Sequence, residues 1–87
     1  MVEQETITQH LNDEEGLPLT FRYKLLAHTQ NVGTQYGIEI ESSRGDRDSL
    51  PNLSEDRQAV EELLALAARL SLSPTHLRDV AEDWLGQ

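Results

Sequence analysis

The side chains best suited to chemistry lie close together near the end of this 87-residue chain. His76 and Asp79 are three residues apart and Asp79 and Asp83 four apart, so a helix would place all three on one side. An imidazole with two carboxylates can bind a divalent metal or act as a general acid–base pair. However, three side chains on one short helix need a further ligand from elsewhere, and Glu82 in the same run can form an i,i+4 ion pair with Arg78. We therefore assign no metal, cofactor or catalytic residue, and keep His76, Asp79 and Asp83 as candidates for an alternative, weak metal-dependent or acid–base activity.

No other motif points to catalysis. The sequence has no cysteine, so it offers neither a Cys–His pair nor a thiolate zinc site. It also lacks a glycine-rich phosphate loop, a nucleophile elbow and a metalloprotease helix motif. A chain of this length can hardly enclose a large ligand pocket. We expect a protein that is not an enzyme.

The charge balance limits the partners. Sixteen acidic and seven basic side chains give a formal net charge of −9. Nucleic acids and anionic membranes are bound by clustered Lys and Arg, so we expect no nucleic-acid or membrane partner. The N-terminus lacks the basic and then apolar order of a signal peptide, and no apolar run is long enough to span a membrane. These features favour a soluble cytoplasmic protein, and the acidity leaves one alternative, a decoy of a nucleic-acid-binding protein.

Two helices are predicted between Ser54 and Leu85, and they must position the residues above. Ser54 is expected to cap the first, with Glu55 and Asp56 in its first turn. Ser73 and Pro74 are expected to start the second, and Gly86 to end it. The apolar stripes of the two helices comprise Val60, Leu63, Leu64, Ala67 and Leu70, and then Leu77, Val80, Ala81, Trp84 and Leu85.

A β-hairpin is predicted from the alternation of residues 19–29 and 36–42, with a turn at residues 30–33. Pairing Leu25 with Ile38 aligns the apolar faces of both strands. The same register pairs Tyr23 with Ile40, Lys24 with Glu39 and Arg22 with Glu41. Each opposite-charge pair contributes about 0.2–1 kcal/mol. This pairing also accounts for the charged patch on the outer face without any ligand.

The expected fold class is therefore α+β, a two-layer ββαα domain over residues 19–87. The antiparallel hairpin is covered by the two C-terminal helices, because a two-stranded hairpin alone is marginal in water. Residues 1–18 form an N-terminal segment in which Glu5 to His10 is either an edge strand or a flexible tail. Ser49 and Leu50 are candidates for a further short strand, so the sheet has two or three strands.

The order of these elements resembles a family. Its most distinctive piece is the run His76-Leu77-x-Asp79-Val80-x-Glu82-Asp83, together with Tyr36-Gly37-Ile38-Glu39-Ile40. Residues 20–85 resemble a domain of unknown function found in short proteins of Firmicutes. The resemblance implies a hairpin followed by helices in a low-GC Gram-positive bacterium, and it implies no activity.

The function that remains is protein interaction. Leu26 falls on the outer face of the hairpin, and Trp84 and Leu85 end the last helix, so these three are the candidate interaction residues. The partner is expected to be another protein or a second copy of the chain in a homodimer.

Overall fold

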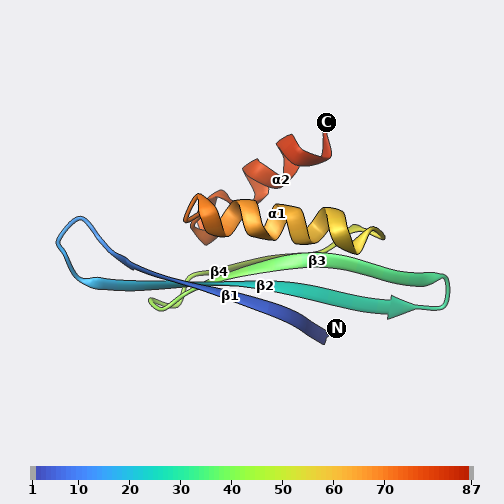
Figure 1. Ribbon diagram of the computed structural model, residues 1–87, viewed down its shortest axis with the longest axis horizontal. Helices are drawn as coiled ribbons and strands as arrows, with labels where there is room; N and C mark the ends of the chain where they lie inside the picture. The colour runs from blue at the N-terminus through green and yellow to red at the C-terminus, as the bar shows by residue number, and fades with distance from the viewer. Residues whose placement is uncertain (1, 87) are drawn as a thin grey trace.

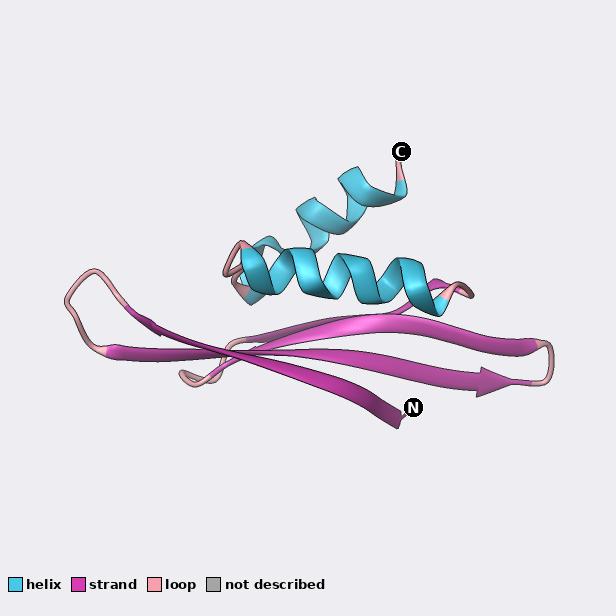
Figure 2. Cartoon of the chain, viewed as in Figure 1, coloured by secondary structure: helices cyan, strands magenta, loops and turns pink. Residues whose placement is uncertain are grey.

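The computed structural model describes residues 2–86, with side chains from Glu5 onward, as one sheet with two helices on one of its faces (Figure 1). The antiparallel sheet has four strands in the order β1-β2-β3-β4. The strands are β1 (Val2–Asn12), β2 (Pro18–Gln30), β3 (Gly33–Ser42) and β4 (Arg47–Ser54). The helices are α1 (Arg57–Arg69) and α2 (Leu77–Leu85), and the 3₁₀ turn η1 (Pro74–His76) precedes α2. Figure 2 shows the two layers, strands below and helices above. The α+β class and the C-terminal helix pair are as predicted.

The sheet is larger than the sequence indicated, because it has four strands rather than two or three. The segment left open as an edge strand or a tail is strand β1, which pairs with β2 from Val2↔Ala27 to Asn12↔Pro18. The side-chain amide of Gln9 also donates a hydrogen bond of 2.9 Å to the Ala68 carbonyl at the end of α1. Strand β1 is thus tied both to the sheet and to the helix layer.

The central hairpin has the predicted register. Leu25 lies opposite Ile38, and Lys24 lies opposite Glu39, as the alternation required. The connection is a two-residue turn between Gln30 and Gly33, and Gly33 has a φ of +135°. This is a conformation that glycine adopts at little cost.

Strand β4 contains a bulge opposite Gly37. Tyr36 pairs with Ser54 and Ile38 with Leu50, so three residues of β4 face one residue of β3. A Cβ atom at Gly37 would collide with the Leu50 carbonyl oxygen and would lie 2.5 Å from backbone carbons of Pro51. The bulge therefore occupies the space of the missing side chain. Pro51 lies within the bulge, which is one of the few places where a sheet accepts proline.

Helix α1 begins later than predicted. Its N-cap is Asp56, whose carboxylate accepts hydrogen bonds from the backbone N–H groups of Gln58 and Ala59. Ser54 is the last residue of β4, and its hydroxyl accepts instead from the N–H of Asp56. The prediction of Ser54 as N-cap, with Glu55 and Asp56 in the first turn, was therefore wrong. A carboxylate satisfies the first N–H groups of a helix as well as a hydroxyl does.

The end of α1 is a Schellman turn. Ser71 has a φ of +53°, Leu72 N–H donates to Ala67 O, and Ser71 N–H donates to Ala68 O. Leu70 is the C-cap and is exposed, so its predicted place in the buried stripe was wrong. The chain then turns through Ser73 and Pro74 into η1 before α2 begins. Ser73 holds the predicted cap position, but it makes no side-chain cap hydrogen bond.

The core lies between α1 and one face of the sheet. Its largest fully buried side chains come from β2, β3, α1 and the start of α2: Tyr23, Leu25, Ile38, Ile40, Leu63, Leu64 and Leu77. Phe21 packs edge-on against Tyr23 at a ring-centroid distance of 6.3 Å. The hydroxyl of Tyr23 donates a hydrogen bond of 2.9 Å to the Leu72 carbonyl, which joins the sheet to the connection between the helices.

Candidate functional site

The residues proposed from the sequence for metal or acid–base chemistry lie on the solvent side of η1 and α2. His76, Asp79 and Asp83 are all exposed. Within residues 2–86 no three His, Asp or Glu side chains are grouped as metal ligands. Arg78 does not pair with Glu82 as predicted. Its guanidinium group binds the Asp48 carboxylate of β4, with Nε 3.0 Å from Oδ2 and Nη2 3.1 Å from Oδ1.

The three predicted interaction residues have different environments. Leu26 is on the outer face as predicted but is only 7% exposed, so it offers little surface to a partner. It lies opposite Gly37, where the backbone of the β4 bulge occupies the sheet face. Trp84 is half-buried against the core, and Leu85 is 55% exposed. Only Leu85 of the three presents a large apolar side chain to solvent.

The opposite face of the sheet has no helix over it, and we call it the helix-free face (Figure 1). Because side chains alternate along a strand, the pairing register assigns residues to it. One row across the four strands is Thr8, Arg22, Glu41 and Arg47. The next rows on either side add His10 with Thr20, and Thr6 with Lys24, Glu39 and Ser49.

Five charged side chains form a network on the helix-free face. Glu41 lies 3.7 Å from both Arg22 and Lys24, and Glu39 lies 3.7 Å from Lys24 and 3.8 Å from Arg47. These separations are ion pairs but are longer than hydrogen bonds. Arg22 and Arg47 are 59% and 64% exposed, so their guanidinium groups remain accessible to a ligand.

A hollow of about 650 Å³ adjoins this network on the same face. It is open to solvent, so it differs from the enclosed ligand pocket that a chain of this length was expected to lack. Its walls carry two guanidinium groups, one carboxylate, one imidazole and hydroxyl groups, from Arg22, Arg47, Glu41, His10, Thr8 and Thr20. Guanidinium, imidazole and hydroxyl groups are donors suited to an oxyanion. The hollow thus offers donors that suit an oxyanion, and among its hydroxyl groups Thr20 Oγ1 lies 3.4 Å from His10 Nδ1.

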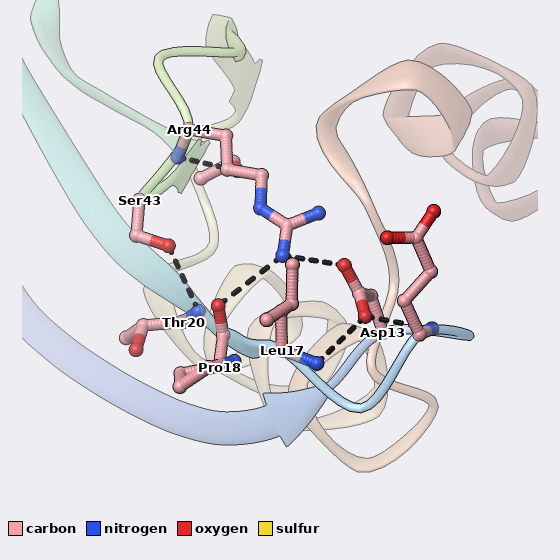
Figure 3. A network of polar contacts seen from close by, with 8 residues as sticks. Asp13, Leu17, Pro18, Thr20, Ser43 and Arg44 are labelled. Atoms are coloured by element: carbon pink, nitrogen blue, oxygen red, sulfur yellow. Dashed lines mark hydrogen bonds and ion pairs between the residues drawn. The ribbon is translucent and has the colours of Figure 1, made fainter.

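The rim of the hollow is fixed by a polar network between two turns (Figure 3). The Arg44 guanidinium group binds the Asp13 carboxylate at 2.7 Å and the Pro18 carbonyl at 3.3 Å. The Ser43 hydroxyl accepts a hydrogen bond of 3.0 Å from the N–H of Thr20. The N–H of Leu17 and the Arg44 guanidinium group hold the pKa of Asp13 below its ordinary value. These contacts lock the β1–β2 turn to the β3–β4 turn.

The sequence pattern indicates only part of this surface. The alternation placed Arg22, Lys24, Glu39 and Glu41 on the outer face, and their mutual pairing explained them. Arg47 lies outside the strands that the alternation predicts. The signal that could have found it is the alternation of β4, which the bulge at Pro51 interrupts.

The two edges of the sheet differ. Strand β4 is flanked by η1 and by the Arg78–Asp48 ion pair, and it contains Pro51. The outer edge of β1 pairs with no segment among the described residues, and β1 contains no proline. An uncovered strand edge is a template for another strand.

No helix among residues 2–86 is long and apolar enough to cross a membrane. Comparison with curated proteins and with solved structures finds no match. A family model, described as a family of unknown function (DUF6514), matches residues 2–87, and so includes the N-terminal segment that the sequence resemblance left outside. The chain therefore belongs to the DUF6514 family of unknown function.

Proposed function

We propose that this protein is a non-catalytic interaction module that binds an extended segment of another protein along the free edge of β1. The observation that carries the proposal is the edge itself, an eleven-residue strand that is paired on one side only within the part of the chain that the structure describes. Strand addition is a common mode of peptide recognition, in which main-chain hydrogen bonds provide the affinity. We place the module in the cytoplasm, as the sequence features favour, of a low-GC Gram-positive bacterium, as the sequence resemblance implies.

The hydrogen-bond pattern identifies the groups that would bind. The N–H of Asp13 donates to the Leu17 carbonyl, so this pair bonds across the β1–β2 ladder. Bonded pairs alternate along antiparallel strands, so Leu11, Gln9 and Ile7 also bond to β2. Thr8 and His10 lie between them. Their backbone N–H and C=O groups therefore point to the open edge.

Strand β1 is held in place by contacts with β2 and with α1. Its register with β2 is continuous from Glu5 to Asn12, and Gln9 binds the end of α1. The strand is therefore ordered before a partner arrives. A preordered edge lowers the entropy cost of strand addition, because only the incoming segment has to be ordered.

The test uses extended peptides selected for binding from a random library. Thr8→Pro removes the outward N–H, and it leaves the β1–β2 ladder intact because that N–H takes no part in it. Thr8→Val is the matched control, since it keeps the N–H and the strand propensity. We expect the peptides to bind the wild type and T8V alike, to lose at least tenfold in affinity on T8P, and to slow hydrogen exchange at Thr8 and His10. Failure to select any peptide, or peptides that bind T8P unchanged, would overturn the proposal.

Self-association along the same edge is the second candidate, because β1 could pair with β1 of another copy. Mass measured in solution distinguishes the two. If the protein is a dimer and T8P converts it to a monomer, the partner at β1 is a second copy of the chain rather than another protein. A dimer that survives T8P but is lost on Leu85→Glu would move the interface to the exposed end of α2.

A further inference from the structure

We propose that the segment bound at β1 is amphipathic and carries two apolar side chains four residues apart, one beside Ile7 and one beside Leu11, on the face of the sheet that the helices cover. This inference rests on the proposed strand addition and names the chemistry of the partner. It is carried by an independent observation, the incomplete burial of the outermost apolar side chains of the core.

The core ends at β1 with side chains that are only partly covered. Ile7 and Leu11 pack against the buried cluster, but both remain half-buried. Leu25 and Ile38 on the inner strands are 0% exposed, and each of these strands has a neighbour on both sides. Within the described part of the chain, β1 has a neighbour on one side only. An added strand would therefore cover the open flank of Ile7 and Leu11, as β1 covers the flank of β2.

The ladder places these two side chains where they would touch a partner. Ile7 and Leu11 direct their backbone groups to β2, so their partners on an added antiparallel strand would form non-hydrogen-bonded pairs with them. Side chains of directly opposite residues lie closest in such pairs, and they point to the same face of the sheet. Since Ile7 and Leu11 are four residues apart, the two apolar residues of the partner are four residues apart as well.

The other positions along the edge favour polar residues. Between Ile7 and Leu11, the side-chain amide of Gln9 donates to the Ala68 carbonyl, so the residue opposite Gln9 would lie beside a polar contact. On the helix-free face, Thr6, Thr8 and His10 are exposed and present no large apolar side chain. The segment that fits this edge is therefore apolar at two positions and polar at the rest.

A second copy of the chain fits this edge poorly. The antiparallel register that places Ile7 opposite Leu11 of the second copy also places Glu5 opposite Asp13 of that copy. Like charges directly opposite each other destabilise a strand pair. A shift of two residues places Leu11 opposite Glu5 in one direction and Ile7 opposite Asp13 in the other, so an acidic residue meets an apolar one. The edge is therefore better matched by a segment of another protein that has no acidic residue at these positions.

The experiment uses three synthetic eight-residue peptides built from threonine. The first carries two valines four residues apart, the second carries two valines three residues apart, and the third carries none. Threonine and valine are both β-branched and both favour strands, so the peptides differ in apolar pattern rather than in strand propensity. Binding to the full chain is followed by NMR at the Thr8 and His10 amides and at the methyl groups of Ile7 and Leu11.

The spacing of the valines should decide the affinity. We expect the first peptide to bind about fivefold more tightly than the all-threonine peptide, because it forms two apolar cross-strand pairs. The second peptide can place only one valine on the helix-covered face, so it should gain about twofold. The methyl signals of Ile7 and Leu11 should both shift with the first peptide.

Three variants separate the outcomes. Ile7→Thr and Leu11→Thr each leave one apolar position, so each should abolish the preference for the first peptide over the second. Leu85→Thr is the control, because it makes the same kind of change at an exposed position on α2 and should keep the preference. Equal binding of the two valine peptides to the wild type, with loss on T8P, would overturn this inference and leave the proposed strand addition intact.

Three further outcomes would count against the proposal. A preference for the first peptide that persists on T8P would place the apolar site away from the edge, and would overturn both this inference and strand addition. Absence of binding by all three peptides would overturn the inference. A dimer that T8P dissociates would assign the edge to a second copy and would overturn it as well.

Discussion

Replacement of Tyr23 by Phe removes one hydroxyl group from the centre of the molecule. Tyr23 is 0% exposed, and its hydroxyl donates to the Leu72 carbonyl at 2.9 Å. The ring of Phe fills the same space, so the change creates no large cavity. It leaves the Leu72 carbonyl without this donor at the turn that joins α1 to η1. Leu72 is partly buried, and an acceptor that loses its donor away from water costs about 1–3 kcal/mol, so we expect the free energy of unfolding to fall by about that amount.

The pH dependence provides a second measure of the same group. Burial raises the pKa of Tyr23 to about 12, from an ordinary value of 10.0. The unfolded chain therefore releases this proton first as the pH rises, while the folded chain still holds it. The stability from this group is fully present below pH 10, and it is lost as the pH rises from 10 through 12. At 1.36 kcal/mol for each pKa unit, the loss above pH 12 approaches about 3 kcal/mol.

The assay is urea unfolding followed by Trp84 fluorescence between pH 7 and pH 11. The difference between the wild type and Y23F isolates Tyr23 from the other groups that titrate in this range. We expect the free energy of unfolding of Y23F to be about 1–3 kcal/mol below that of the wild type at pH 7, and we expect this gap to narrow above pH 10. Tyr36→Phe is the control, because Tyr36 is half-buried and its change should stay within about 0.5 kcal/mol. A Y23F protein as stable as the wild type, or a gap that is constant to pH 11, would refute the reasoning.

Two further substitutions test the backbone. Gly37→Ala places a methyl group against the Leu50 carbonyl and the Pro51 backbone, so we expect a loss of about 3 kcal/mol and NMR shift changes along β4. A variant of unchanged stability would mean that the bulge is not packed on Gly37. Ser71 has the left-handed backbone conformation, which costs a non-glycine residue about 1–2 kcal/mol, and Ser71→Gly removes this strain. Since glycine adds about 0.4–1 kcal/mol of unfolded-state entropy, we expect a net gain near 0.5 kcal/mol in urea unfolding, and a net loss would contradict the strain.

The hairpin could be predicted because two independent patterns agreed on one register. The apolar pair Leu25–Ile38 and the charged pair Lys24–Glu39 require the same alignment, and the structure has both. The helix stripes were similarly redundant, since five apolar positions recur at helical spacing in each. The helix starts were less redundant. A single polar residue decides a cap, and Ser54 and Asp56 are both good candidates.

The outer strands could not be predicted from local pattern. Strand β1 carries few large apolar side chains, so its state depends on hydrogen bonds to β2 rather than on burial. Strand β4 contains Pro51, which ordinarily argues against a strand. It is accepted here only because Gly37, fourteen residues earlier on the neighbouring strand, leaves room for a bulge. Such compensation between distant residues has no signature in either segment alone.

The failure to predict β1 and β4 also explains why the charges on the outer face of the hairpin were attributed to cross-strand pairing alone. With only the hairpin in place, Arg22 and Lys24 balance Glu39 and Glu41, and no charge is left for a ligand. Addition of β4 brings Arg47 within 3.8 Å of Glu39. Addition of β1 supplies the hollow and the open edge beside it. The hollow and the open edge of the sheet therefore depend on the two strands that the sequence pattern specifies least.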